Sequence, residues 1–148
     1  MKKNDYIINP KTGTPIFGTI PLIQNKSYTF PEGDIFLKYG VHQKVNRGFG
    51  AIHIWKEHEN EILAMGYEAS EKIALTAHFV SDILQSGTKI YCEFSRQGKE
   101  RLTVLKRNNR VVIIEHLHDG NYNTVYSVVS AYKLTRRKPH GQLIGNLK

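Results

Sequence analysis

Apolar residues recur at two different spacings along the chain, and the first spacing is helical. Between residues 48 and 86 they recur every three or four positions, which predicts helices over about 48–66 and about 70–86. In the second segment the apolar positions form a single stripe, which we expect to be core. The stripe consists of Ile73, Ala77, Val80 and Leu84.

After Gly87 the apolar spacing changes to two, which is typical of strands. Turn signals rich in glycine and asparagine separate four such segments. Because the connections are short, neighbouring strands must run antiparallel. The segments span about 88–95, 100–107, 110–117 and 122–134.

Residues 1–40 differ in composition and pattern from the rest of the chain, since they hold four of the five prolines and only short strand-like runs. We expect them to form an irregular N-terminal extension, followed by a functional domain over 41–148 that ends in a basic tail. The predicted fold class is α+β, with an irregular lead-in and two helices packed on one face of a four-stranded antiparallel meander. The other sheet face is then free to form a groove.

Charge narrows the classes of partner. Lysine and arginine number 21 against 13 acidic residues, and the formal charge of +8 favours a polyanion. A basic protein without such a partner would have the same balance, so charge alone leaves both open. The single cysteine, Cys92, excludes an internal disulfide and a cysteine-based zinc site, and its apolar neighbours predict a buried, inert thiol.

Targeting signals and membrane segments are not evident. No run approaches the ~18–20 apolar residues of a membrane-spanning helix, so we expect no membrane partner. No apolar region follows the charged N-terminus, so we expect no signal peptide, and export would require a larger carrier. A lone reduced cysteine and a nucleic-acid substrate would both indicate the cytoplasm.

The histidines argue against a metal centre. His53 and His58 are five residues apart, and on a regular helix they would point about 140° away from each other. His116 and His118 share a strand face, but no third ligand is evident nearby. Gly48-Phe49-Gly50 lacks the lysine of a phosphate-binding loop. We therefore predict no metal and no cofactor.

The remaining polar residues suit cleavage of RNA without metal. The 2′-hydroxyl of RNA attacks the adjacent phosphorus if a base removes its proton and an acid protonates the leaving 5′-oxygen. Histidine suits either proton role, and the arginine fork fits phosphate oxygens. His53 lies early in its predicted helix, and Glu57, one turn later, is placed to orient it. A satisfied buried histidine is the alternative interpretation of His53.

Even spacing places Tyr126, Ser130 and Tyr132 on one face of the last strand. Arg101 and Arg107 share a face of the second predicted strand, so both sets are expected to line one groove. Exposed strands also carry tyrosine, threonine and arginine for β propensity and solubility, and the pattern alone leaves both interpretations open.

Two short motifs resemble a known family. Gly48-Phe49-Gly50-Ala51-Ile52-His53-Ile54, followed by His58, resembles the Gly-Phe-Gly-x-x-His-Ile…His segment of the phage-associated barnase–EndoU–colicin–RelE-like nucleases. Val128-Val129-Ser130-Ala131-Tyr132 is similar to the Val-Val-Thr-Ala-Tyr ending of that family, with serine in place of threonine. The resemblance covers roughly residues 35–134.

The resemblance implies a metal-independent ribonuclease fold used by phage-encoded and interbacterial toxins, often against tRNA. It implies that His53 transfers a proton and that Ser130 and Tyr132 complete the site on the last strand. His58 matches the second histidine of the family. Arg101 opens a strand where such enzymes often keep a phosphate-binding arginine.

The sequence thus predicts a toxin-type endoribonuclease that forms a 2′,3′-cyclic phosphate. Its expected partners are RNA, with tRNA a candidate substrate, and a cognate immunity or antitoxin protein. Rival predictions are a non-catalytic RNA- or DNA-binding module and a phage structural or interaction domain. The catalytic set is His53, Arg101, Ser130 and Tyr132, with support from Glu57, His58 and Tyr126. Residues expected to bind RNA phosphates are Arg107, Arg110, Arg136, Arg137 and Lys138.

Overall fold

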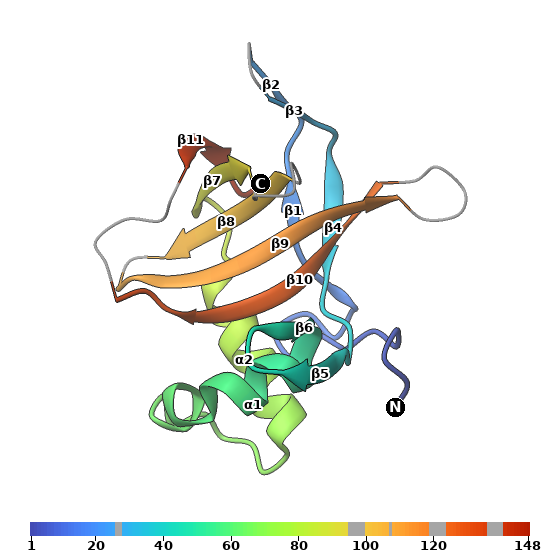
Figure 1. Ribbon diagram of the computed structural model, residues 1–148, viewed down its shortest axis with the longest axis vertical. Helices are drawn as coiled ribbons and strands as arrows, with labels where there is room; N and C mark the ends of the chain where they lie inside the picture. The colour runs from blue at the N-terminus through green and yellow to red at the C-terminus, as the bar shows by residue number, and fades with distance from the viewer. Residues whose placement is uncertain (26–27, 95–99, 107, 119–123, 136–140) are drawn as a thin grey trace.

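The computed structural model describes residues 1–25, 28–94, 100–106, 108–118, 124–135 and 141–148. Within these residues the chain forms two helices and eleven strands, and most strands join one curled mixed sheet (Figure 1). The strands of this sheet are β1 (Ile16–Ile20), β4 (Gly33–Phe36), β7 (Lys89–Phe94), β8 (Glu100–Lys106), β9 (Arg110–His118), β10 (Thr124–Lys133) and β11 (Gln142–Asn146).

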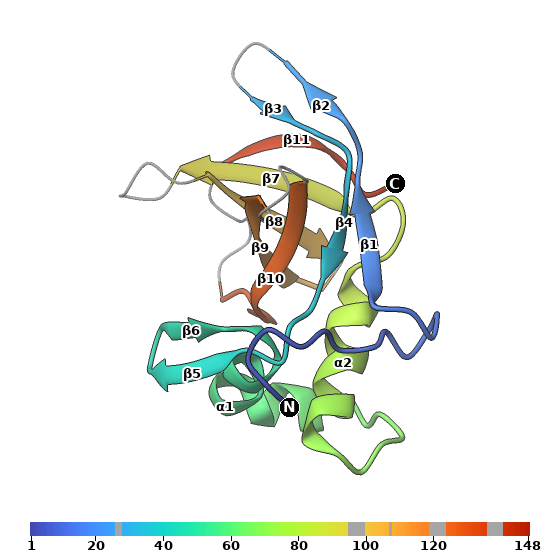
Figure 2. The same ribbon diagram turned by 90° about the vertical axis from the view of Figure 1, so that its right-hand side faces the viewer.

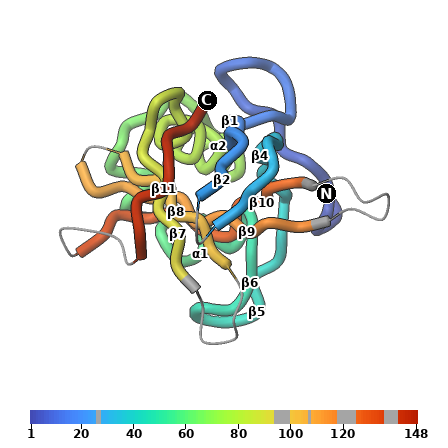
Figure 3. Tube along the Cα trace, turned by 90° about the horizontal axis from the view of Figure 1, so that it is seen from above, coloured from blue at the N-terminus to red at the C-terminus, as the bar shows by residue number. Residues whose placement is uncertain are grey.

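The sheet order is β1-β4-β10-β9-β8-β7-β11. β4 and β10 run parallel, and the other neighbouring strands run antiparallel. The backbone N–H of Lys148, just beyond β11, donates to the Thr19 carbonyl in β1 at 3.1 Å. The sheet therefore curls until the two ends of its strand order approach each other (Figures 2 and 3).

The predicted α+β class, with two helices on a four-stranded meander, is wrong, and the fold is mostly β. The four predicted strands are confirmed as β7–β10, and they do form an antiparallel meander. Residues 1–40 were expected to be irregular, but they supply β1 and β4, and residues 142–146 supply β11. The β4–β10 pairing joins segments about ninety residues apart, so local spacing gives no sign of it.

The two predicted helices are confirmed as α1 (Gly50–Leu63) and α2 (Lys72–Ile83). In α2, Ala77 and Val80 are buried and Ile73 is partly buried, and Leu84, the residue after the helix, is also buried. These side chains belong to one core cluster that also includes Val104, Ile114 and Val128 from the sheet. α2 therefore covers one face of the sheet, as its apolar stripe predicts.

A hairpin of β5 (Val41–Lys44) and β6 (Arg47–Phe49) lies beside α1 (Figure 2). A second hairpin, of β2 (Ile23–Gln24) and β3 (Thr29–Phe30), lies at the other end of the molecule. On the sheet face away from the main core, Val111, Ile113 and Leu134 form a smaller apolar cluster. α1 and the first hairpin border this second face.

Backbone atoms rather than a side chain anchor the start of α1. The N–H groups of Ala51 and Ile52 donate to the carbonyls of Lys38 and Tyr39, both at 2.9 Å. Gly50 has a φ of 81°, and a Cβ there would stand 2.6 Å from the Lys38 carbonyl oxygen. Glycine is therefore required where the chain enters the helix.

Two further expectations concern Cys92 and membrane spans. The Cys92 side chain is fully buried, as predicted, and burial raises the pKa of its thiol to about 12. In the described part of the chain, neither helix has the length and apolar character needed to cross a bilayer.

Candidate active site

A cavity of ≈ 420 Å³ lies between the first hairpin, α1 and the sheet. Six of the predicted site residues line it, from three separate parts of the chain: His53, Glu57 and His58 on α1, Arg101 on β8, and Ser130 and Tyr132 on β10. The other described residues that line it are Asn46, Gly48, Ile113 and Val129.

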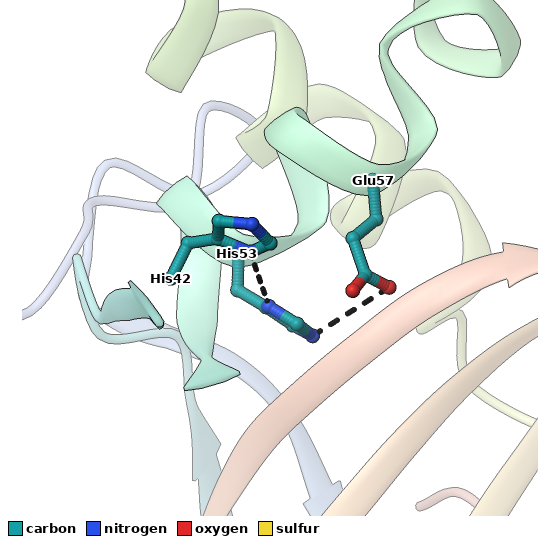
Figure 4. A group of neighbouring side chains, drawn as sticks. All are labelled: His42, His53 and Glu57. Carbon is teal, nitrogen blue, oxygen red and sulfur yellow. Dashed lines mark hydrogen bonds and ion pairs between the residues drawn. The ribbon is translucent and has the colours of Figure 1, made fainter. Parts of the chain in front are cut away.

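His53 occupies the first turn of α1, and its side chain is only 5% exposed. A hydrogen bond of 3.0 Å joins its Nδ1 to Nδ1 of His42, and the two rings stack with centroids 5.2 Å apart. Nε2 lies 3.8 Å from Oε2 of Glu57 (Figure 4). The ring is therefore held on both edges by polar groups instead of being sealed among apolar side chains.

Burial is the largest influence on the charge of His53, and it lowers the pKa of the ring below its ordinary value. The carboxylate of Glu57 opposes this effect, while His42 and His58 add to it. His53 is therefore neutral at pH 7, as a general base must be before it accepts a proton.

Glu57 joins the helix to the hairpin and to both imidazoles. Its Oε1 accepts a hydrogen bond from the Asn46 backbone N–H at 2.5 Å. Its Oε2 lies 3.8 Å from Nε2 of His53 and 3.9 Å from Nε2 of His58. The carboxylate thus stands between two groups that are able to transfer protons.

A kink in α1 brings His58 to the cavity. A regular helix would direct His58 away from His53, but His58 has non-helical backbone angles of φ −132° and ψ 27°. Its ring stacks on Tyr132 with centroids 5.3 Å apart, and its Nδ1 lies 3.5 Å from Oε1 of Glu61. The predicted divergence of the two histidines is therefore wrong, because the helix is kinked at His58.

A β-bulge at Val129 decides which residues of β10 reach the cavity. The register passes from Val128 opposite Ile114 to Ser130 opposite Ile113, so Val129 is an extra residue. Beyond the bulge, Ser130 and Tyr132 line the cavity. An extra residue reverses the alternation of faces, so residues of equal parity on its two sides face in opposite directions.

Tyr126 lies before the bulge, and the structure does not bring it to the cavity. Its side chain is fully buried in the main core. Its hydroxyl donates to the Pro31 carbonyl at 2.6 Å, and its ring stacks on His116 with centroids 5.1 Å apart. Burial raises the pKa of the Tyr126 hydroxyl above its ordinary value. The prediction that Tyr126 shares a face with Ser130 is wrong, and Tyr126 is a core residue.

Arg101 supplies the positive charge of the cavity. It lies directly opposite Glu115 on β9, and Nη2 is 3.8 Å from Oε1 of that carboxylate. The Arg101 side chain remains 42% exposed. A loose pair of this kind leaves the guanidinium accessible to a phosphate.

Arg110 does not point into this cavity. Its Nη1 lies 3.4 Å from Oδ2 of Asp82, a carboxylate that also binds Lys106 at 3.1 Å. The predicted role of Arg110 in gripping RNA therefore competes with an internal ion pair. The other predicted phosphate-binding residues lie outside the described residues: Arg107, Arg136, Arg137 and Lys138.

His42 is the main site residue that the sequence prediction missed. It lies on β5, opposite Gly48 on β6. The available signal was the short strand-like run of residues 41–49, whereas the sequence prediction began a helix at about residue 48. Recognising the hairpin would have placed a second imidazole beside the start of the helix.

His42, His53 and Glu57 offer side-chain atoms that all lie within 4.8 Å of one another, close enough to hold a metal ion. The prediction of no metal rested on other histidine pairs and did not include His42. In the structure, His42 and Glu57 contact different ring nitrogens of His53. These contacts form a chain of polar groups, and cleavage measured with and without chelator distinguishes this chain from a metal site.

Comparisons with protein-family models, characterised proteins and solved structures find no match to this chain. The function is therefore inferred from the geometry of the cavity. It combines a neutral buried imidazole, a second imidazole, a carboxylate, an accessible guanidinium and two hydroxyls.

Proposed function

We propose that this protein is a metal-independent endoribonuclease of the toxin type. The main support for this proposal is that two imidazoles flank one carboxylate in a cavity that Arg101, Ser130 and Tyr132 also line. The net charge of +8 supports a polyanionic substrate. The motif resemblance points to the same class of reaction.

The reaction follows from the roles that these side chains suit. Nε2 of His53 takes the proton of the RNA 2′-hydroxyl, and the 2′-oxygen forms a bond to the adjacent phosphorus. The bond from phosphorus to the 5′-oxygen breaks, and that oxygen takes a proton from His58. The products are a 2′,3′-cyclic phosphate and a 5′-hydroxyl, and no water is consumed.

The other side chains act on the phosphate and on the bases. The Arg101 guanidinium stabilises the negative charge that builds on the phosphate oxygens during attack. The hydroxyls of Ser130 and Tyr132 are suited to donate hydrogen bonds to the same group. Tyr132, stacked on His58, also offers an aromatic face to an unpaired base.

The biological setting belongs to the same proposal. RNA, tRNA included, is the substrate, and the enzyme acts in the cytoplasm of the cell in which that RNA is found. A producing cell needs protection from such an enzyme. We expect a cognate immunity or antitoxin protein with an acidic surface that covers the cavity of this basic protein.

Incubation of the protein with total RNA in excess chelator tests the proposal. Wild-type protein should produce fragments whether or not the chelator is present. His53→Gln should slow cleavage by about 100-fold or more, the contribution typical of a positioned proton-transfer group. His78→Gln is the matched control, because His78 stacks on Tyr67 and does not line the cavity. This variant should cleave RNA at the wild-type rate.

Three results would count against this function. One is intact RNA at high protein concentration, and another is cleavage that His53→Gln leaves unchanged. Cleavage abolished by chelator would replace the proposed chemistry with a metal-dependent one. Salt-sensitive RNA binding without product would favour the non-catalytic nucleic-acid-binding module, for which the charge alone suffices.

A further inference from the structure

His42 contacts His53 on the edge of the ring that faces away from the proposed substrate. The contact combines the Nδ1–Nδ1 hydrogen bond of 3.0 Å with ring stacking at an interplanar angle of 29° (Figure 4). His42 is not among the described residues that line the cavity. Its effect on substrate must therefore pass through His53.

The hairpin enforces this contact. His42 pairs with Gly48 across β5 and β6, and Gly48 has a φ of 147°. A Cβ at Gly48 would stand 2.7 Å from Nδ1 of His53 and 3.1 Å from Cα of His42. The absence of a side chain at Gly48 allows the hairpin to close over the Nδ1 edge of His53. Of the two ring nitrogens of His53, only Nε2 lies on the side of Glu57 and the cavity.

A neutral imidazole carries one proton, and its position decides which nitrogen is the base. If Nδ1 of His53 holds the proton, it donates to Nδ1 of His42 and leaves a lone pair on Nε2. If Nε2 holds the proton, the ring has no base on its open side. In that second state His42 would donate to Nδ1 of His53, and the lone pair of His53 would face the hairpin, where no substrate reaches it.

We propose that His42 is a positioning residue that accepts the Nδ1–H of His53 and thereby holds Nε2 as the nitrogen that takes up the substrate proton. The use of that nitrogen rests on the proposed ribonuclease function, whereas the tautomer is a property of the resting protein. When Nε2 gains a proton, the Nδ1 proton stays in its bond to His42. The new N–H then faces the Glu57 carboxylate, which stabilises the imidazolium.

Nitrogen NMR of 15N-histidine-labelled protein tests the tautomer without any activity. In chelator at pH 7.5, His53 of the wild type should carry its proton on Nδ1 and a bare nitrogen at Nε2. His42→Phe keeps an aromatic ring for stacking but removes the acceptor, so His53 should shift toward the Nε2–H form. His42→Asn presents Oδ1 near the former Nδ1 and should restore the Nδ1–H form.

RNA cleavage supplies the second readout. His42→Phe should reduce kcat by about 10- to 100-fold with little change in KM, less than the loss of the proton-transfer group itself. His42→Asn should recover most of that loss, and His78→Phe should behave as wild type because its ring lies on Tyr67. Rescue by asparagine distinguishes an acceptor role from mere packing.

The proposal is overturned if wild-type His53 carries its proton on Nε2. It is also overturned if folded His42→Phe keeps the wild-type tautomer and kcat. The wild-type spectrum alone is decisive if His42→Phe fails to fold. If the tautomers behave as expected but wild-type protein cleaves no RNA, the proposed function fails and the positioning role of His42 stands.

Discussion

At the scale of single residues, the environment of His53 decides what the cavity is able to do. The ring is buried, one nitrogen is bound to His42, and the other faces Glu57 at 3.8 Å. Desolvation disfavours the charged imidazolium, while the carboxylate limits how far it is disfavoured. The result is a neutral imidazole with a counter-charge ready for the proton it accepts.

This balance predicts the pH dependence of cleavage. A base is active when deprotonated, and burial lowers the pKa of His53 below its ordinary value of 6.5. The rate should therefore rise with pH along an acidic limb centred below pH 6.5. Measurement of kcat/KM from pH 4.5 to 8 checks this, and a limb centred above 6.5 would contradict it. His53→Gln should lose the limb.

Two tyrosines of β10 provide a matched pair of substitutions. Tyr126→Phe removes the hydroxyl that donates to the Pro31 carbonyl, so unfolding free energy should fall by about 1–3 kcal/mol while cleavage is unchanged. Tyr132→Phe removes the hydroxyl of a residue that lines the cavity, so cleavage should fall. Urea unfolding and initial cleavage rates measure both effects. Loss of activity in folded Tyr126→Phe would contradict the core placement of this residue.

At the scale of elements, two departures from regular geometry build the site. The kink at His58 turns the second imidazole of α1 toward the sheet. The bulge at Val129 turns Ser130 and Tyr132 toward the helix. Without the kink in α1 and the bulge in β10, the side chains of His58, Ser130 and Tyr132 would not face the same cavity. Local irregularities of this kind are common beside functional sites.

The β5–β6 hairpin is the third element, and Gly48 is its most demanding position. A Cβ at Gly48 would stand 2.2 Å from the Val41 carbonyl oxygen in addition to its clash with His53. Gly48→Ala should reduce the free energy of unfolding by about 2–5 kcal/mol through backbone strain and steric overlap. It should also reduce cleavage in whatever fraction remains folded.

Gly66→Ala is the control for this substitution. Gly66 also has a positive φ, of 69°, but a Cβ there meets nothing within 4 Å. Backbone strain alone should lower the free energy of unfolding of Gly66→Ala by about 1–2 kcal/mol. Its RNA cleavage should remain normal. Urea denaturation of both variants measures the difference, and equal costs would show that the hairpin does not press on His53.

The same elements show where sequence reasoning succeeds. The apolar stripe of α2 and the alternating segments of β7–β10 follow regular spacing, so the sequence predicted their type and approximate bounds correctly. His53, Glu57 and Arg101 were found because their positions depend only on such regular elements. His42 was missed because its position depends on a hairpin closing over a helix start.

The kink and the bulge were missed for a related reason. Spacing arguments assume an unbroken period, and a single irregular residue inverts them. His58 was therefore assigned to the wrong side of α1, and Tyr126 was assigned to the wrong face of β10. Both errors disappear once the irregular residue is known.

At the scale of the whole molecule, the curled sheet was the feature that the sequence did not reveal. β1, β4 and β11 come from the two ends of the chain and join the meander at its outer strands. Their pairings join residues far apart in the sequence. The strands are also short, and nearby prolines and glycines interrupt the alternating pattern that would predict a strand. The result is a mostly β body whose second face, together with α1 and the hairpin, forms the cavity.

The charge of +8 is also a property of the whole molecule, and it predicts salt-sensitive binding to RNA. With catalytically impaired His53→Gln, the affinity for single-stranded RNA should fall with salt along a log–log slope of about −2 to −4, as expected for about three to five phosphate contacts. Fluorescence anisotropy at several salt concentrations measures the slope. Chelator should not alter it, and a slope near zero would contradict a polyanion-binding surface.

End-group analysis of cleaved RNA tests the central claim most directly. A defined oligoribonucleotide is incubated with wild-type protein in excess chelator, and the fragments are identified by mass spectrometry beside the DNA oligonucleotide of the same sequence. We expect RNA fragments that end in a 2′,3′-cyclic phosphate and begin with a 5′-hydroxyl, and intact DNA, because attack requires the 2′-hydroxyl. Fragments with 5′-phosphates, cleavage of the DNA, or no cleavage of the RNA would contradict the account.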